Sequence, residues 1–393
     1  MIKRAAEKAL KRLASQFPVV GITGPRQSGK TTLAKLVFPE KRYISFDDKS
    51  FRELAGANPI DFLRAFPDGL IIDEAQKVPD IFDAVKYFAD NCDFTPGKFI
   101  LTGSSQFRLK ENMAESLAGR AAFLRLLPFS ISELKAENLL PKDVYDLIFY
   151  GQYPPLYDLR KNFDRMDWYE SYINGYLDLD VKDMINPSNV SSFRKFIQLC
   201  AVYSGQILSK DSIARDLGIS APTVKNWLSI LEASSVIYFL DAVAANLGKA
   251  LIKSPKLYFA DTGLLCSLLG INSKEKLLLS RHKGAIVENF AVAELLKSRL
   301  NAAKRPNLAY YRDRGGLEVD AVAEWERPYA IEIKSDSRTE KKMSAGARKY
   351  AELRSSDKVE PTVFYTGEIS CQINGARYVS WKNWGDFDLA DMS

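Results

Sequence analysis

The sequence has 393 residues, of which 46 % are hydrophobic and 26 % are charged, so it is long enough for two or three globular domains. Its single histidine, His282, excludes His-rich zinc sites and most catalytic pairs that depend on histidine. The formal net charge of +6 favours nucleic acid only weakly as a partner. No stretch approaches 18 uncharged apolar residues, so we expect no membrane partner.

Residues 1–17 are basic and lack the apolar run of a signal peptide. Their apolar residues recur at helical spacing, which predicts an amphipathic helix. The four cysteines lie far apart and form no metal-binding spacing. We therefore expect reduced core thiols and a cytoplasmic protein.

Residues 24–31, Gly-Pro-Arg-Gln-Ser-Gly-Lys-Thr, fit the phosphate-binding loop pattern at every fixed position. A buried strand is expected at 18–23 and a helix at 32–37, so the loop would lead into a helix N-terminus that favours anions. Lys30 would reach the β- and γ-phosphates of ATP, and the Thr31 hydroxyl would hold Mg²⁺. The predicted nucleotide contacts are Gly24, Pro25, Arg26, Gln27, Ser28, Gly29, Lys30, Thr31 and Thr32.

The expected strand at 69–74 ends in two acids, Asp73 and Glu74. Asp73 is predicted to hold the Mg²⁺ shell and Glu74 to polarise the attacking water. The alternative is a strand that ends in solvated acids. The next buried strand, 98–105, ends in hydroxyl groups, of which Thr102 or Ser104 would sense the γ-phosphate.

The middle of the chain changes character after a break at 150–155. Aromatic residues at helical spacing over 168–180 predict a helix whose aromatic stripe is core. Residues 209–231 then predict a helix-turn-helix, and a strand at 236–242 makes it a winged version. Its second helix would expose Thr223, Lys225 and Asn226. This helix would expose little positive charge for a DNA-binding helix, so DNA contact and a purely architectural role both stay open.

The C-terminal part predicts a helix over 283–300 and strands at 308–312, 318–323 and 329–334. Glu332 and Lys334 are two apart on a strand and therefore share a face. With Asp320 and the upstream Glu288, they could hold Mg²⁺ and position a water for phosphodiester cleavage. The predicted metal ligands here are Glu288, Asp320 and Glu332, and the predicted catalytic residues are Asp320, Glu332 and Lys334.

Residues 320, 332 and 334 resemble the PD-(D/E)XK nuclease core, with Val319 in place of the proline. The whole chain resembles a bacterial and archaeal family of AAA-type P-loop ATPases that carry this C-terminal domain. The resembling stretches are residues 24–31, 117–120, 151–155 and 254–263. The resemblance implies ATP binding and hydrolysis. It also implies a nuclease core that many members carry without a shown activity.

Arg120 stands just before an expected strand at 121–127, where AAA-type ATPases place an arginine finger. There its guanidinium would stabilise the transferring phosphoryl group, within its own chain or in a neighbouring subunit of a homo-oligomer. The alternative is an ordinary surface charge.

We therefore predict an α/β protein with a P-loop parallel sheet flanked by helices, then a helical and winged-helix region, then a smaller α/β nuclease-like domain. The predicted boundaries are 1–135 for the ATPase domain, 136–190 for a helical lid, 191–255 for the winged helix and 256–393 for the nuclease-like domain. One hypothesis is an ATPase that acts on DNA with a metal-dependent nuclease. The other is an ATP-dependent switch whose later domains only bind partners.

Overall fold

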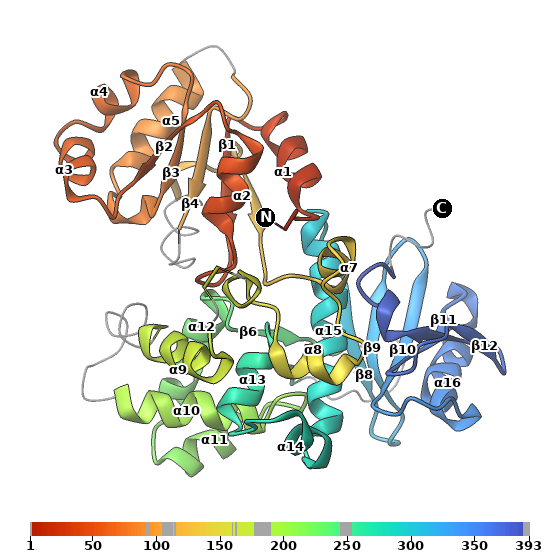
Figure 1. The fold of residues 1–393 in the computed structure, drawn as a ribbon. Coiled ribbons are helices and arrows are strands. Elements are labelled where there is room, and N and C mark those ends of the chain that lie inside the picture. The colour runs from red at the N-terminus through yellow and green to blue at the C-terminus, as the bar shows by residue number, and fades with distance from the viewer. Residues whose placement is uncertain are drawn as a thin grey trace. The chain divides into compact units, whose positions relative to one another are not determined.

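The computed structural model describes residues 2–91, 95–103, 113, 115–158, 160–161, 163–176, 190–243 and 254–387. The chain divides into two compact units (Figure 1). The first comprises Met1–Phe129, Ala233–Ser235 and Arg299–Lys304, and the second comprises Ser130–Glu232, Val236–Ser298 and Arg305–Ser393. The first unit thus ends near the boundary predicted at 135, but residues 130–135 belong to the second unit.

The first unit is built on a five-stranded sheet with the order β2-β3-β4-β1-β5, in which every pairing is parallel. Its strands are β1 (Val19–Thr23), β2 (Arg42–Ser45), β3 (Leu70–Asp73), β4 (Phe99–Thr102) and β5 (Ala121–Arg125). Parallel strands bring all their carboxyl ends to one edge of the sheet. The predicted acids and the predicted sensor hydroxyl therefore meet at the edge where the P-loop begins.

Helices cover both faces of this sheet (Figure 1). They are α1 (Glu7–Ala14), α2 (Lys30–Val37), α3 (Lys49–Ala57), α4 (Pro59–Arg64), the 3₁₀ turn η1 (Ala75–Lys77) and α5 (Ile81–Asn91). Helices α3 and α4 are separate, because Asn58 between them has an extended backbone and caps α4. Pro59 then occupies the first helical turn, where its missing N–H is harmless.

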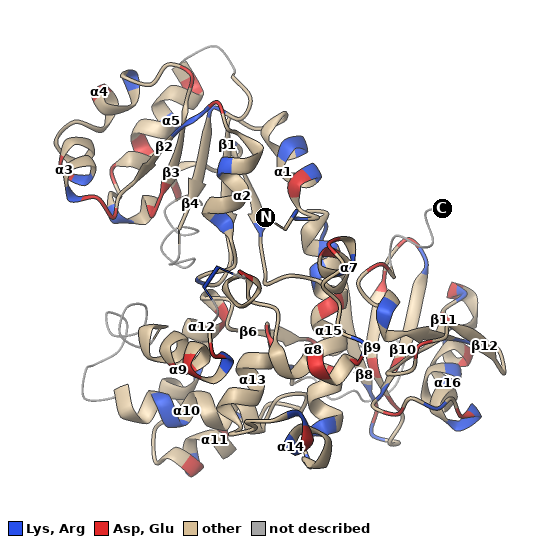
Figure 2. Cartoon of the chain, in the orientation of Figure 1, with Lys and Arg blue, Asp and Glu red and all other residues tan. Residues whose placement is uncertain are grey.

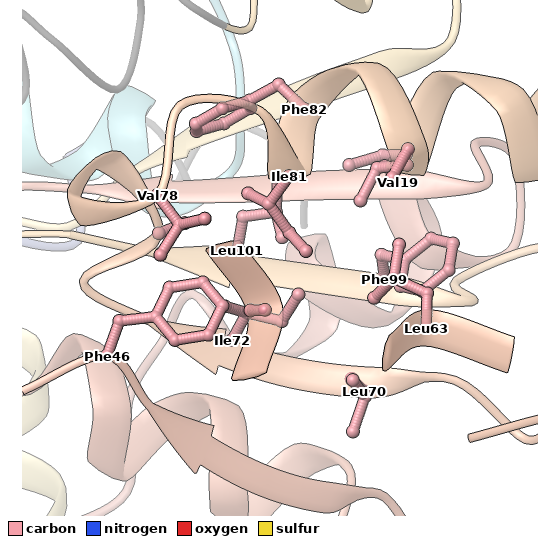
Figure 3. Close-up of a cluster of buried hydrophobic side chains, with 14 of the residues drawn as sticks. Val19, Phe46, Leu63, Leu70, Ile72, Val78, Ile81, Phe82, Phe99 and Leu101 are labelled. Carbon is pink, nitrogen blue, oxygen red and sulfur yellow. The ribbon is translucent and has the colours of Figure 1, made fainter. Parts of the chain in front are cut away.

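Alternating residues of the strands fill two separate cores. Val19, Ile72 and Leu101 pack with Phe82 of α5 on one face (Figure 3). Their neighbours along the same strands, such as Val20, Ile71 and Ile100, pack against α1 and α2 on the other. A sheet buried on both sides explains why its strands are continuous apolar runs in the sequence.

The second unit begins with helices. They are α7 (Ile131–Ala136), α8 (Val144–Tyr150), η2 (Pro154–Tyr157), α9 (Arg165–Tyr176), α10 (Val190–Val202), α11 (Lys210–Leu217), α12 (Ala221–Ala233), α13 (Thr262–Leu268), α14 (Lys274–Leu279) and α15 (Lys283–Asn301). Among them β6 (Ile237–Leu240) pairs antiparallel with β7 (Lys256–Phe259). The domain boundary predicted between 255 and 256 is therefore wrong, because it separates two paired strands.

A six-stranded sheet with the order β12-β13-β11-β10-β9-β8 completes the second unit. Its strands are β8 (Leu308–Arg312), β9 (Glu318–Glu324), β10 (Pro328–Lys334), β11 (Glu360–Tyr365), β12 (Cys371–Ile373) and β13 (Ala376–Ser380). The turns η5 (Lys341–Ser344), η6 (Ser355–Asp357) and η7 (Trp381–Asn383) and helix α16 (Ala345–Leu353) lie among them in sequence. The first three strands were predicted, whereas β11, β12, β13 and α16 were not.

Lysines, arginines and acidic residues are distributed over the helices and strands of both units (Figure 2). Within the described ranges, no helix is both long enough and apolar enough to cross a membrane.

Candidate functional site

The P-loop connects β1 to α2 and closes around the Lys30 side chain. Gly29 caps α2 with φ 92°, a left-handed backbone that favours glycine. Lys30 is 7 % exposed, and its Nζ donates to the carbonyl oxygens of Gly24 and Pro25 at 2.9 Å each. Gln27 and Thr32 are exposed, and Arg26 is half-buried. The Lys30 ammonium group therefore lies inside the curve of the loop, where a phosphate site requires it.

Arg4, which the sequence analysis missed, holds the P-loop from outside. Its guanidinium donates to the carbonyl oxygens of Ser28 and Leu127, both at 2.6 Å, and stacks over the Phe129 ring. Arg4 is 7 % exposed, although it lies in a segment that reads only as the basic start of an amphipathic helix. A planar, multiply donating guanidinium can fix two backbone segments at once. No local motif signals that role.

Asp73, at the end of β3, receives hydroxyl donors from three other elements. Thr31 of α2 donates to Asp73 Oδ2 at 2.9 Å, and Thr102 of β4 donates to Asp73 Oδ1. Tyr43 of β2 also donates to Oδ2, at 3.0 Å. The structure thus brings together Thr31, Asp73 and Thr102, as predicted from their places in the sequence.

Tyr43 is a second residue that the sequence analysis missed. Burial, together with the neighbouring Asp73 carboxylate, raises the pKa of Tyr43 to about 12. The phenol therefore stays protonated at physiological pH and remains a donor to Asp73. The sequence gives little sign of this role for Tyr43, since a single tyrosine in a half-buried strand is common.

Glu74 has φ 54°, an uncommon backbone for a residue other than glycine. It precedes η1 and makes no side-chain cap to that turn. Its carboxylate Oε2 instead accepts a hydrogen bond from Nε2 of Gln76. Glu74 thus follows Asp73 directly, at the carboxyl edge where a water-activating acid is expected.

The residues at this edge fit a nucleotide with its magnesium ion. The Ser28 hydroxyl is buried in the loop and has no hydrogen-bond partner among the described residues. The Thr31 hydroxyl and the Asp73 carboxylate lie together and offer the hard oxygen ligands that Mg²⁺ prefers. Ser104, the alternative sensor, lies outside the described residues.

Arg120 lies at the opposite edge of the same sheet. It precedes β5, and its carbonyl oxygen accepts from Val19 N at the start of β1. Its guanidinium pairs with both carboxylate oxygens of Asp90 and donates to the Ala118 carbonyl oxygen. Of the two alternatives for Arg120, action on the phosphates of its own chain is not supported, because the length of β5 separates the two edges.

In the second unit, Asp320 of β9 and Glu332 of β10 oppose each other. Ile331 pairs with Ala321, so the next positions are directly across the two strands and share a face. Lys334 Nζ lies 2.6 Å from Glu332 Oε2 and 3.9 Å from Asp320 Oδ2. Asp320 Oδ2 also accepts from Ile333 N at 2.8 Å. The convergence of Asp320, Glu332 and Lys334 predicted from their spacing is present.

Glu288 of α15 joins this group through residues of β7. Its Oε1 accepts from Lys256 Nζ at 3.0 Å and from the Tyr258 hydroxyl at 2.6 Å. Burial, and next the Asp320 carboxylate, raise the pKa of Glu288 to about 7. Lys256 also contacts Glu318 at 3.0 Å. Burial lowers the pKa of Lys256, but these carboxylates outweigh burial and raise it above its ordinary value.

These carboxylates do not fit a divalent metal ion as they are arranged. No group of three acids, cysteines or histidines in the described ranges has the geometry to hold one. Lys334 Nζ lies within 4 Å of both Asp320 and Glu332, and Lys256 Nζ pairs with Glu288 through a side chain that is only 3 % exposed. The prediction that Glu288, Asp320 and Glu332 are metal ligands is therefore not supported. Two lysines supply the positive charge that the prediction assigned to Mg²⁺.

The two helices predicted around a turn at Gly218 are present as α11 and α12. Ser220 accepts from Thr223 N at 3.2 Å and so caps α12. Trp227 is buried against Phe193 and Phe196 of α10. On the outer side Lys225 and Asn226 are exposed, while Thr223 is half-buried.

Comparison with known proteins finds matches along most of the chain. A family profile described as an AAA domain matches residues 16–135, and two domains of unknown function, DUF8612 and DUF4143, match residues 141–275 and 283–384. The solved Walker-type ATPase PABY2304 of Pyrococcus abyssi is 16 % identical, with a TM-score of 0.45, over 67 % of this chain and 94 % of that one.

Two curated relatives are longer matches. The uncharacterized protein MJ1544 of Methanocaldococcus jannaschii is 24 % identical over 79 % of this chain and 73 % of its own length. The uncharacterized protein Rv2008c of Mycobacterium tuberculosis is 33 % identical over 85 % of this chain and 74 % of its own. The chain therefore belongs to the same family as Rv2008c, with an AAA-like P-loop fold in its first unit.

Proposed function

We propose that the first unit binds and hydrolyses ATP with Mg²⁺. The observation that carries the proposal is that Thr31 and Thr102 each donate a hydrogen bond to a different carboxylate oxygen of Asp73. The P-loop that surrounds Lys30 begins at the same edge of the sheet. In a P-loop site a hydroxyl and an acid of this kind hold the metal, and a lysine meets the β- and γ-phosphates.

Each residue has one task in this proposal. Lys30 and the loop bind and orient the phosphates, and Thr31 and Asp73 hold the ion. When bound, the ion would neutralise charge on the β- and γ-phosphate oxygens. Glu74 accepts a proton from the attacking water. Thr102 senses the γ-phosphate and is joined to Asp73 by a hydrogen bond.

The test is ATP binding by Lys30→Ala, measured by calorimetry with Mg²⁺ present. Loss of the cation that faces the phosphates should abolish tight binding. Lys49→Ala is the matched control, since Lys49 is an exposed lysine of the same unit that pairs with Glu53. Unchanged ATP affinity in Lys30→Ala would refute the site.

For the second unit we infer partner binding rather than metal-dependent DNA cleavage. The observation is that Lys256 and Lys334 already neutralise the carboxylates that a nuclease would present to its metal. DNA is one candidate partner, which α12 would contact through Lys225 and Asn226. ATP turnover in the first unit would then regulate that contact.

Incubation of the full chain with supercoiled and single-stranded DNA decides between the two hypotheses. We expect no cleavage above that of Asp320→Ala with Mg²⁺ or Mn²⁺, with or without ATP. The same metals should raise the melting temperature of wild type and Asp320→Ala equally, because only a ligand held by Asp320 would separate them. Asp320-dependent cleavage would restore the nuclease hypothesis.

A further inference from the structure

We propose that Gln76 is a positioning residue for Glu74 in ATP hydrolysis. The proposal rests on the proposed function, in which Glu74 accepts the proton of the attacking water. Gln76 lies in η1, two residues after Glu74, and its Nε2 donates to Glu74 Oε2. The sequence gives it no role, because a glutamine after two acids belongs to no motif considered above.

The surroundings of Gln76 are those of a constrained side chain. It is 8 % exposed, and its Oε1 is buried without a hydrogen-bond partner among the described residues. Buried amide oxygens are nearly always satisfied in folded proteins. The exchanged orientation would set Oε1 against the Glu74 carboxylate and bring two acceptors together. The hydrogen bond to Glu74 therefore fixes the orientation of the Gln76 amide and leaves Gln76 Oε1 unsatisfied.

The backbone restricts Glu74 as well. Its left-handed conformation is closed by a hydrogen bond from Lys77 N to the Glu74 carbonyl oxygen at 2.9 Å. Strained backbone of this kind persists where the surrounding structure determines it. With its main chain fixed by the turn and its carboxylate fixed by Gln76, Glu74 is held in one orientation.

Gln76 also packs against the strand that carries Thr102. A Cβ atom built on Gly103, the residue after Thr102, would lie 2.2 Å from Gln76 Oε1. Gly103 has no left-handed φ that would by itself disfavour alanine. The bare backbone at this position therefore leaves room for the Gln76 amide between β4 and Glu74. Gln76 thus connects the predicted γ-phosphate sensor with the predicted base.

The test is a double-mutant cycle measured as kcat and as ATP affinity. Gln76→Ala should lower kcat by about tenfold to a hundredfold, the scale of a misoriented catalytic group, and leave the Kd for ATP unchanged. Glu74→Gln should be slower still. In the Glu74→Gln background Gln76→Ala should have no further effect, because Gln76 acts only through Glu74.

Lys77→Ala is the control, since Lys77 lies in the same turn but contacts Asp47 outside the site. Gly103→Ala provides a second route, because its methyl group should displace Gln76 and lower kcat, and Gln76→Ala should relieve that defect. Normal kcat in Gln76→Ala, or additive losses in the cycle, would overturn the inference. Normal kcat in Glu74→Gln would instead overturn the proposed role of Glu74.

Discussion

Asp73 and Glu74 are adjacent in sequence, yet the structure gives them different surroundings. Asp73 receives hydroxyl donors from β2, β4 and α2, which suits a carboxylate that holds an ion. Glu74 receives an amide donor from its own turn. The backbone changes from strand to left-handed turn between them, and the two side chains have different hydrogen-bond partners.

Glu288 should make the stability of the second unit depend on pH. Its folded pKa is about 7, against a reference value of 4.5, because of burial and the facing Asp320. Glu318, Lys334, Lys256 and Tyr258 are the other titratable groups around it. The folded state therefore binds more protons than the unfolded state between pH 4.5 and 7, so this contribution to stability falls as the pH rises through that window.

Urea unfolding of wild type and Glu288→Gln checks this expectation. Glutamine keeps an acceptor for Lys256 and Tyr258 but does not titrate in this range. The stability of wild type relative to the variant should decrease from about pH 5 to about pH 7.5 and change little above that. Groups that do not face Glu288 titrate alike in both proteins, so a constant difference would contradict the raised pKa of Glu288.

At the scale of elements, α15 organises the second unit. Asn289 accepts from Phe259 N and donates to Phe259 O, both at 2.7 Å, which joins the helix to β7. Glu294 accepts from Ile131 N at 2.7 Å and from Gln152 Nε2 at 2.8 Å. A helix buried on most sides must satisfy its polar residues internally, and α15 does so through contacts distant in sequence.

Lys297→Met should destabilise the second unit strongly. Lys297 Nζ lies 2.9 Å from Glu294 Oε1, and both side chains are 0 % exposed. Removal of one partner leaves a buried carboxylate without its counter-ion, which costs about 3–5 kcal/mol. Lys276→Met, at an exposed position of α14, is the matched control. Chemical unfolding followed by tryptophan fluorescence measures both, and equal stabilities would contradict the expectation.

The stretches at 151–155 and 254–263 show what sequence could and could not predict. Each stretch was recognisable because it resembles a known family, but the contact between the two stretches was not predicted. Asp261 accepts from Gln152 N at 2.7 Å, from Leu264 N at 2.8 Å and from the Tyr169 hydroxyl at 2.7 Å. A motif with fixed local spacing, such as the P-loop, is readable in one sequence. A contact across 109 residues is not, because neither side carries a local signal of its partner.

The same reason explains the other differences. Strands of the first sheet were predicted because burial on both faces makes them apolar runs. Arg4 and Tyr43 were missed because their partners are backbone carbonyls and a carboxylate brought near by folding. Lys256 was missed because nothing in its local sequence marks it as the partner of Glu288, which lies 32 residues further along the chain. The carboxylates that it neutralises therefore read as a metal site.

At the scale of the whole molecule, the parallel sheet of the first unit separates the predicted nucleotide site from the Arg120–Asp90 ion pair. The predicted nucleotide-binding residues lie at its carboxyl edge, and Arg120 and Asp90 pair near its amino edge. An arginine far from its own P-loop could still serve a neighbouring subunit. That version needs Arg120 to release Asp90, whose pKa the hydrogen bond from Arg120 holds below its usual value.

We expect Arg120 to be a structural residue, because its guanidinium already engages both Asp90 oxygens and the Ala118 carbonyl oxygen. Arg120→Ala should then keep ATP turnover within about twofold, since exposed ion pairs contribute little. Wild-type turnover per chain should not change over a hundredfold range of protein concentration, about 0.1 to 10 μM, if no neighbour completes the site. Arg120→Ala mixed with Glu74→Gln should show only the sum of the two separate rates. A mixture faster than that sum would mean that an intact Arg120 serves an intact Glu74 across an interface between subunits, and that Asp90 holds the arginine only in the isolated chain.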